Sequence, residues 1–229
     1  MSLRSVDAPL NPYLSDRRLL VEPSILSADF TRLGDECRAA MAAGGDALHV
    51  DVMDGHFVPN ISLGPVICEA AHRAAPDAFL DVHLMCTDPG RWVDPYADAG
   101  AGHIQFHVEV MPRPAALVER IRARGMTAGI VLNPDTPASV CADAIPLVDT
   151  VMLMSVHPGK SGQQFIASVL PKAPELLSMM RPGQRLMIDG GVSPATAPAC
   201  REAGISVLIA ASAIYGTRDY AAAITAIRG

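Results

Sequence analysis

The sequence has no long apolar run and no excess of basic residues. No stretch approaches the ~20 apolar residues that a membrane-spanning helix needs, and the N-terminus lacks the apolar core of a signal peptide. The five cysteines are an odd number without a C-x-x-C pair, which indicates reduced thiols and a cytoplasmic protein. A net charge of −6 disfavours nucleic acid as a partner, because binding a phosphate backbone requires a basic face. A small phosphorylated ligand needs only a few local donors and is not excluded.

The chain of 229 residues is 50% hydrophobic and 18% charged, which is typical of a well-packed globular protein. Residues 1–18 carry scattered charge, two prolines and no clear period, so we expect an N-terminal leader or tail. From residue 19 to residue 229, short apolar runs alternate with stretches rich in alanine, leucine and arginine. The expected strands lie near residues 20–26, 46–53, 78–85, 103–108, 127–132, 148–156, 184–189 and 205–210. The expected helices lie near residues 30–43, 65–75, 90–99, 114–124, 137–144, 165–180, 195–203 and 218–228.

This alternation predicts an α/β fold. Eight strand–helix units of roughly 26 residues each fit a (β/α)₈ TIM barrel that forms a single domain. A doubly wound open sheet is the alternative, and the near-equal lengths of the units favour closure. In a barrel, active-site groups are expected at the C-terminal ends of the strands and in the loops that follow them.

Two of the expected strands carry the same polar residue types on one face. In residues 48–55 the side chains alternate, so His49, Asp51 and Met53 share one side. Residues 81–85 repeat these types in another order, and residues 187–191 end on a carboxylate followed by two glycines. Imidazoles and carboxylates from separate strand ends are the ligands of a divalent metal. The candidates are His49, Asp51, His83 and Asp189.

Other interpretations apply to single residues of these strands. An isolated inward histidine, such as His103 or His107, is more often a hydrogen-bonded core residue than a ligand. This interpretation does not suit two histidines that share their strand faces with carboxylates. Burying unpaired carboxylates costs too much free energy unless a metal, a cation or hydrogen-bond donors are present. Met53, Met85 and Met154, taken alone, are core residues, and their place beside the site strands makes a soft, polarisable wall an equal alternative.

Several motifs then resemble the ribulose-phosphate 3-epimerase family. The first four are PSILSADF (23–30), HVDVMDG (49–55), FVPN (57–60) and DVHLM (81–85). They are followed in order by LNPDTP (132–137), MSVHPG with its GQ-x-F (154–165), IDGGV (188–192) and ASAIYG (211–216). The resemblance runs from about residue 20 to the end and leaves the N-terminal tail outside.

The resemblance implies a TIM barrel with a divalent metal, zinc, manganese or iron(II), bound by His49, Asp51, His83 and Asp189. Asp51 and Asp189 would also act as the acid/base pair of a metal-dependent isomerase that interconverts D-ribulose 5-phosphate and D-xylulose 5-phosphate in the pentose phosphate pathway. Ser24 and His83 would contact the substrate near the metal. Homo-oligomers are common in the family, so self-association is expected. The phosphate would bind to Gly159, Lys160, Ser161, Gly162, Gly190, Gly191, Ala211 and Ser212.

The chemistry of inversion fits these residues. A carbon next to a carbonyl must lose a proton from one face and regain one on the other, which two carboxylates on opposite sides of a substrate can do. The carbon acid is very weak, and a metal supplies several kcal/mol of stabilisation to the enediolate. A barrel that bound sugar phosphate without turnover would lack Asp51 or Asp189, and both are present.

Five residues depart from the family pattern. His157 stands in place of an asparagine, Lys160 and Ser161 replace a phenylalanine and a glycine, Met187 replaces a glutamate, and Ala211 replaces a glycine. All except Met187 are expected where substrate would be enclosed, and a methyl group at residue 211 disfavours positive φ. The same chemistry on a four- or six-carbon ketose phosphate, such as allulose 6-phosphate, is therefore the alternative function.

Overall fold

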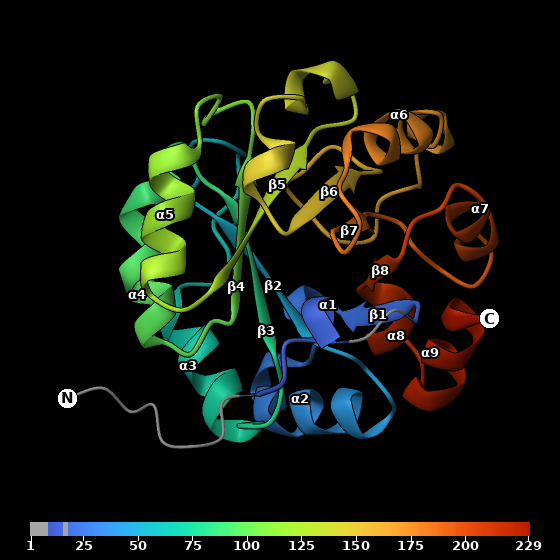
Figure 1. The fold of residues 1–229 in the computed structure, drawn as a ribbon. Coiled ribbons are helices and arrows are strands. Elements are labelled where there is room, and N and C mark those ends of the chain that lie inside the picture. Colours follow the sequence, from blue (N-terminus) through green and yellow to red (C-terminus); the bar gives the residue numbers. More distant parts are fainter. Residues whose placement is uncertain (1–8, 16–17) are drawn as a thin grey trace.

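The computed structural model describes residues 9–15 and 18–229, in which eight parallel strands alternate with helices (Figure 1). The strands are β1 (Leu20–Pro23), β2 (Leu48–Met53), β3 (Leu80–Met85), β4 (His103–His107), β5 (Thr127–Leu132), β6 (Thr150–Met154), β7 (Arg185–Asp189) and β8 (Val207–Ala210). The helices are α1 (Pro12–Ser15), α2 (Leu33–Ala42), α3 (Pro65–Ala74), α4 (Val93–Asp98), α5 (Ala115–Ala123), α6 (Lys172–Met179), α7 (Ala197–Glu202), α8 (Ser212–Tyr215) and α9 (Tyr220–Arg228).

The sheet curves into a barrel. Its strand order runs from β1 through β8, β7, β6, β5, β4 and β3 to β2. The seam between β1 and β2 is closed by one parallel bridge between Ser24 and His49. Lower in the seam, the Asp46 carboxylate accepts the Val21 N–H at 2.8 Å, and the Asp46 N–H donates to Val21 O at 3.0 Å. The predicted TIM barrel is confirmed.

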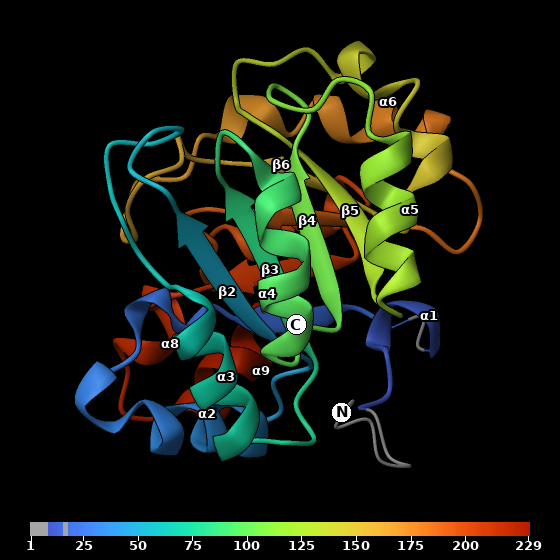
Figure 2. The same ribbon diagram turned by 90° about the vertical axis from the view of Figure 1, so that its left-hand side faces the viewer.

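The helices cover the outside of the barrel, as Figure 2 shows for α3, α4 and α5 against β2–β5. The outward-facing side chains of β2, Val50 and Val52, belong to the large apolar cluster that lies between strands and helices. Burying such apolar surface is the main favourable contribution to folding. No helix in the described part of the chain is long and apolar enough to cross a membrane. All five cysteines are buried and unpaired.

Several expected helices are shorter than predicted or replaced by 3₁₀ turns. The stretch 137–144 contains no α-helix and instead forms the 3₁₀ turns Ala138–Cys141 and Ile145–Leu147. Pro146 lies at the start of the second of these turns, where its missing N–H is tolerated. The start of the first helix holds a 3₁₀ turn, Phe30–Arg32, capped by the Asp29 side chain. Further 3₁₀ turns are Ile25–Ser27, Pro89–Trp92 and Ala167–Val169.

The N-terminal segment is only partly a tail. Residues 1–8 and 16–17 of the expected tail lie outside the described residues. In α1, Tyr13 is 2% exposed, and its ring meets Phe79 edge to face at 5.4 Å between centroids. Its hydroxyl donates to Glu22 Oε1 at 2.8 Å. Tyr13 belongs to the apolar cluster that also contains Leu20 and Phe79. Tyr13, within the expected tail, is therefore buried against the barrel.

Candidate active site and metal centre

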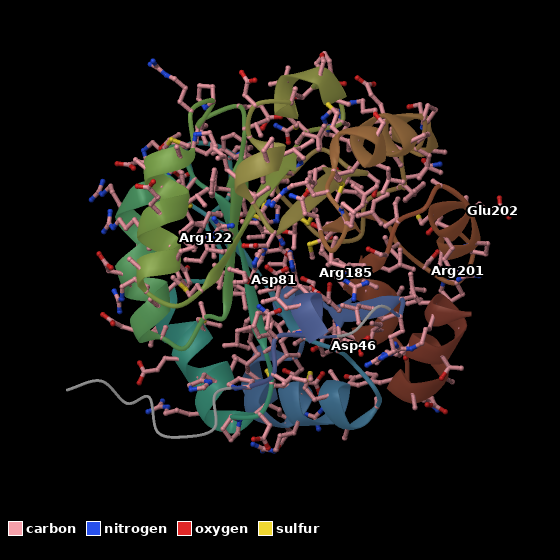
Figure 3. The ribbon with its side chains drawn as sticks, in the orientation of Figure 1. Asp46, Asp81, Arg122, Arg185, Arg201 and Glu202 are labelled. Atoms are coloured by element: carbon pink, nitrogen blue, oxygen red, sulfur yellow. The ribbon has the colours of Figure 1, made fainter. Side chains whose placement is uncertain are left out.

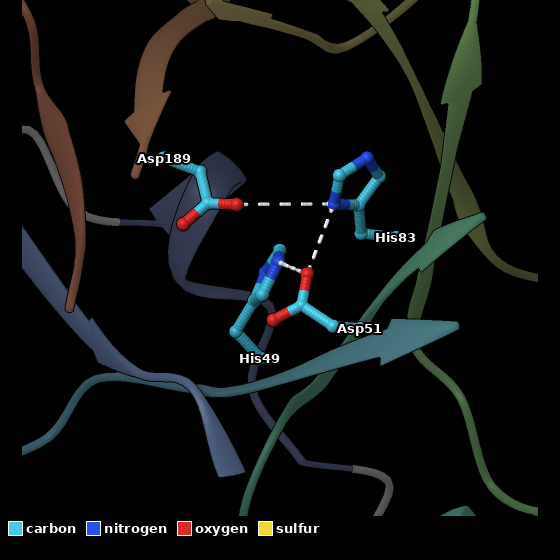
Figure 4. A group of neighbouring side chains, drawn as sticks. All are labelled: His49, Asp51, His83 and Asp189. Carbon is cyan, nitrogen blue, oxygen red and sulfur yellow. Dashed lines mark hydrogen bonds and ion pairs between the residues drawn. The ribbon is translucent and has the colours of Figure 1, made fainter. Parts of the chain in front are cut away.

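The register of β2 against β3 brings the polar residues of both strands together. His49 pairs with Asp81, and Asp51 pairs with His83. Side chains of paired residues in neighbouring strands point to the same face, so a histidine on one strand lies beside a carboxylate on the other. Asp189 arrives from the last position of β7. Figure 4 shows the side chains of His49, Asp51, His83 and Asp189 converging inside the barrel.

Four side chains, His49, Asp51, His83 and Asp189, each offer a ligand atom, and these atoms lie within 4.8 Å of one another. Asp51 Oδ1 lies 3.3 Å from His49 Nε2 and 3.1 Å from His83 Nδ1 (Figure 4). His83 Nδ1 lies 3.9 Å from Asp189 Oδ2. The His49 Nε2 atom is buried and has no hydrogen-bond partner in the described structure. Two imidazole nitrogens and two carboxylates are a donor set that suits Zn²⁺, Mn²⁺ or Fe²⁺, so the residues fit the expected metal.

The two carboxylates have opposite electrostatic environments. Burial, together with the negative charge of Asp51, raises the pKa of Asp189 to about 7. Burial alone would also raise the pKa of Asp51, but the charge of His49 and the hydrogen bonds from His49 and His83 lower it below its usual range. Buried carboxylates this close to one another favour a bound cation, and groups whose pKa values are driven apart can serve as an acid and a base.

Hydrogen bonds from neighbouring side chains orient His49 and Asp51. His49 Nδ1 lies 2.7 Å from Asp81 Oδ2, which also accepts from Gln105 Nε2 at 2.7 Å. Asp81 is fully buried near the centre of the barrel (Figure 3). The Ser24 hydroxyl donates to Asp51 Oδ2 at 2.6 Å. These contacts leave His49 Nε2 and Asp51 Oδ1 directed at the candidate metal position.

The sequence patterns assigned no role to three residues in contact with this site. Asp81 could have been found from its place on the same strand face as His83. His107 is a buried, hydrogen-bonded histidine, as expected from the sequence, and its Nε2 lies 2.9 Å from His83 Nε2. Gln105 lies on the same face of β4 as His107. His103 does match the core interpretation, because its two ring nitrogens meet the hydroxyls of Thr127 and Thr150 at 2.8 and 2.9 Å.

A cavity opens above the four side chains. Asp51 and Asp189 line it, whereas the two histidines lie beneath them and do not. Met53, Met85 and Met154 line the cavity as well, so the three thioethers are both packed and facing it. The remaining expected residues on its wall are Gly159, Lys160, Ser161, Gly162, Gly190, Gly191, Ala211 and Ser212.

Gly190 and Gly191 follow β7 on the cavity wall, and both require glycine. Gly190 has a φ of +114°, and a Cβ there would lie 2.4 Å from Val156 Cγ2. Gly191 has a φ of +65°, and its Cβ would lie 2.8 Å from the backbone nitrogen of Phe165. L side chains rarely adopt this backbone region. The bare backbone thus comes close to the cavity at this corner.

Residue 211 does not share this requirement. Ala211 has a φ of −102°, so its methyl group needs no positive φ. The expectation that alanine at residue 211 would alter the backbone is therefore wrong. The substitution of alanine for glycine only adds a methyl group to the cavity wall. Met187 is fully buried inside the barrel with Met152 and Val207, which explains an apolar residue there.

The loop after β6 covers the cavity and contacts two other loops. Ser161 Oγ lies 2.6 Å from Ser27 Oγ, and Asn60 Nδ2 donates to Gly159 O at 2.9 Å. Lys160 lies on the cavity wall within this loop. The exposed side chain of His157 does not line the cavity; its Nδ1 lies 3.7 Å from Asp135 Oδ2. The expectation that residue 157 would help to enclose a substrate is therefore wrong.

Comparison with known proteins agrees with this geometry. The sequence profile of the ribulose-phosphate 3 epimerase family matches residues 20–215. The chain belongs to this family. A ribulose-phosphate 3-epimerase of Bacillus subtilis is 47% identical over 213 residues, which cover 91% of this chain and 98% of the relative. A chloroplastic ribulose-5-phosphate-3-epimerase of Arabidopsis thaliana is 43% identical and covers 92% of this chain and 76% of the relative.

Solved structures that share the barrel are more distant in sequence. A 3-hexulose-6-phosphate synthase superposes with a TM-score of 0.67 at 20% identity and covers 92% of this chain and 98% of the other. KGPDC from Streptococcus mutans gives a TM-score of 0.67 at 16% identity over 92% of this chain and 96% of the other. These likenesses show the fold alone. The epimerase-family relatives confirm that this chain is an isomerase of that family, as its motifs predict.

Proposed function

We propose that this protein is a metal-dependent 3-epimerase that interconverts D-ribulose 5-phosphate and D-xylulose 5-phosphate. The observation that carries the proposal is the pair of carboxylates, Asp51 and Asp189, that face one cavity beside two buried histidines. The names of the relatives in Bacillus subtilis and Arabidopsis thaliana support the substrate.

The two aspartates exchange protons with opposite faces of the substrate carbon. Asp51 extends from β2 and Asp189 from β7, two strands that are not neighbours in the barrel, so the carboxylates reach a substrate from different sides. One takes a proton from C3 and the other returns a proton to the opposite face; in the reverse reaction they exchange roles. The low pKa of Asp51 and the raised pKa of Asp189 suit a pair in which one group is ionised and the other protonated.

His49, Asp51, His83 and Asp189 would hold one dication, zinc, manganese or iron(II). When bound, the ion would stabilise negative charge on the substrate oxygens next to the reacting carbon. Ser24 keeps the Asp51 carboxylate oriented through Oδ2, so that Oδ1 is directed at the imidazole nitrogens. The thioethers of Met53, Met85 and Met154 keep water away from the reacting carbon and present polarisable surface to it.

The far end of the cavity takes the phosphate in this proposal. Gly190, Gly191, Ser212 and the loop of residues 159–162 line the cavity. Exposed backbone N–H groups at the ends of barrel strands seven and eight commonly bind phosphate. Lys160 adds a cation, and the Ala211 methyl group narrows the same region, which is why another ketose phosphate is the second candidate substrate.

A substrate panel in deuterated water tests the proposal. The protein reconstituted with zinc or manganese should epimerise ribulose 5-phosphate faster than four- or six-carbon ketose phosphates and should place deuterium at C3 of the product. Asp189→Asn and Asp51→Asn should each lower kcat by at least about 10²–10⁴-fold. Inversion without deuterium exchange would contradict proton abstraction. Faster turnover of a six-carbon ketose phosphate would establish the second candidate.

A further inference from the structure

Two hydrogen bonds hold the tip of the loop after β6 against the loops that follow β1 and β2. The hydroxyl oxygens of Ser161 and Ser27 lie 2.6 Å apart, so one hydroxyl donates to the other. The Asn60 side chain donates from Nδ2 to Gly159 O at 2.9 Å. Both hydrogen bonds join protein atoms, and they can therefore form before a substrate binds.

The rest of this loop is held together by its own hydrogen bonds. Gln163 Nε2 donates to His157 O at 2.7 Å and to Lys160 O at 3.0 Å, which links the two sides of the loop. Where the loop ends, the Ile166 N–H donates to Ser155 O at 2.8 Å and fixes its base beside β6. The tip can therefore move away from the cavity as a unit once its two outer hydrogen bonds break.

Ser161 supplies a hydroxyl that the family pattern does not have. The pattern has a glycine at this position, which carries no side chain that could bond to Ser27. Ser161 lines the cavity, whereas Ser27 is not among the described residues of the cavity wall. An effect of Ser27 on the cavity must therefore act through Ser161 and the loop.

We propose that Ser27 is a positioning residue that holds the loop of residues 159–162 over the cavity through Ser161. Substrate then enters, and product leaves, only when this serine pair separates. The proposal rests on the proposed function, in which the same loop binds the phosphate. Lys160 lies between the two bonded residues, Gly159 and Ser161, so the same contacts keep Lys160 at the cavity wall. Loops that cover an active site commonly open and close during turnover.

Trypsin cleavage after Lys160 measures how often the loop opens. Lys160 is exposed, but a protease needs the backbone on both sides of the cut to leave the fold, and both neighbouring residues are hydrogen-bonded. Where the loop opens and closes faster than it is cut, the rate of cleavage follows the open population. Ser27→Ala removes one hydrogen bond and should raise this rate by about 2–13-fold, measured by mass spectrometry without substrate.

A double-variant cycle shows whether the two serines act together. Ser161→Ala should raise the rate of cleavage as much as Ser27→Ala does, and the double variant should show no further increase, because both changes remove the same hydrogen bond. Ser161→Ala alters the residue after the cut, so each rate is divided by that of a peptide with the same sequence. Ser178→Ala is the control: its hydroxyl donates to Glu175 O at 2.7 Å, outside the loop, and its loss should leave the rate unchanged.

A reversible crosslink tests the connection to turnover. Because the two hydroxyl oxygens lie 2.6 Å apart, cysteines introduced by Ser27→Cys and Ser161→Cys can be joined as a disulfide with oxidised glutathione. The native cysteines are buried, and burial raises the pKa of each thiol, so they react slowly with this oxidant. Oxidation should abolish turnover of ribulose 5-phosphate by the double variant, and a reductant should restore it. Wild-type protein treated in the same way should keep its activity.

Three results would overturn the proposal. The first is a Ser27→Ala protein that is cut after Lys160 at the wild-type rate. The second is a pair of single effects that multiply in the double variant, and the third is a crosslinked protein with full turnover. A wild-type protein that turns over no ketose phosphate would instead contradict the proposed function, and the cleavage rates would still decide whether the serine pair holds the loop.

Discussion

Replacing Tyr13 tests whether the N-terminal segment is part of the barrel. This residue lies before residue 20, where the match to the family begins, yet its side chain is almost completely buried. Its ring meets His103 at 4.9 Å between centroids as well as Phe79, and its hydroxyl donates to the buried Glu22. Tyr13→Ala removes all of these contacts, whereas Tyr13→Phe removes only the hydrogen bond.

The contacts of Tyr13 set the size of the effect. Truncating a buried aromatic side chain to alanine costs about 3–5 kcal/mol of the free energy of unfolding. Tyr13→Phe leaves Glu22 Oε1 without its donor, and an unpaired buried polar group costs about 1–3 kcal/mol. For a protein of this size, each kcal/mol lowers Tm by about 2–4 °C. We therefore expect Tm to fall by about 6–20 °C in Tyr13→Ala and by about 2–12 °C in Tyr13→Phe.

Thermal unfolding followed by calorimetry and circular dichroism measures these shifts. Leu14→Ala is the matched control, because Leu14 lies in the same helical turn and its side chain is 66% exposed. A surface substitution of this kind changes stability by no more than about 0.5 kcal/mol. If Tyr13→Ala and Leu14→Ala had the same Tm, the segment would not be packed in solution and the reasoning would be refuted.

Three further predictions concern the metal, a loop carboxylate and the cavity wall. Chelation should abolish turnover and lower Tm, because the carboxylates beside His49 and His83 lose their cation; zinc or manganese should restore both, and an unchanged chelated protein would argue against a metal. The Asp54 carboxylate is partly buried, but hydrogen bonds from Thr87, Phe57 and His56 lower its pKa to about 2. Its stabilisation is present above the unfolded pKa of about 4 and is lost as pH falls towards 2. The Tm difference between wild type and Asp54→Asn should therefore shrink between pH 5 and pH 2, and a constant difference would contradict this origin. Lys160→Ala should raise KM for the ketose phosphate with little change in kcat, measured by steady-state kinetics; an equal KM would remove Lys160 from phosphate binding.

The sequence by itself determined the barrel and the candidate ligands. In such a barrel, one face of each strand is buried under helices and the other faces the site. The side chains therefore alternate with a period of two residues, which can be seen in the sequence alone. The pattern placed His49 and Asp51 on one face of a strand. It also indicated that His83, on the next strand, belongs to the same metal site. The match of motif order also identified the family. The strand patterns are local signals, because each depends only on residues within one strand.

Only the tertiary structure decided which atoms meet. The shift between β3 and β4 brings His107 against His83, and the fold of the loop after β5 directs Glu109 at His107; neither contact follows from a period within one strand. The burial of Tyr13 likewise depends on the packing of α1 against residues of the barrel that are distant in the chain. Contacts between residues distant in the chain depend on the packing of the whole barrel, so a pattern within one segment cannot specify them.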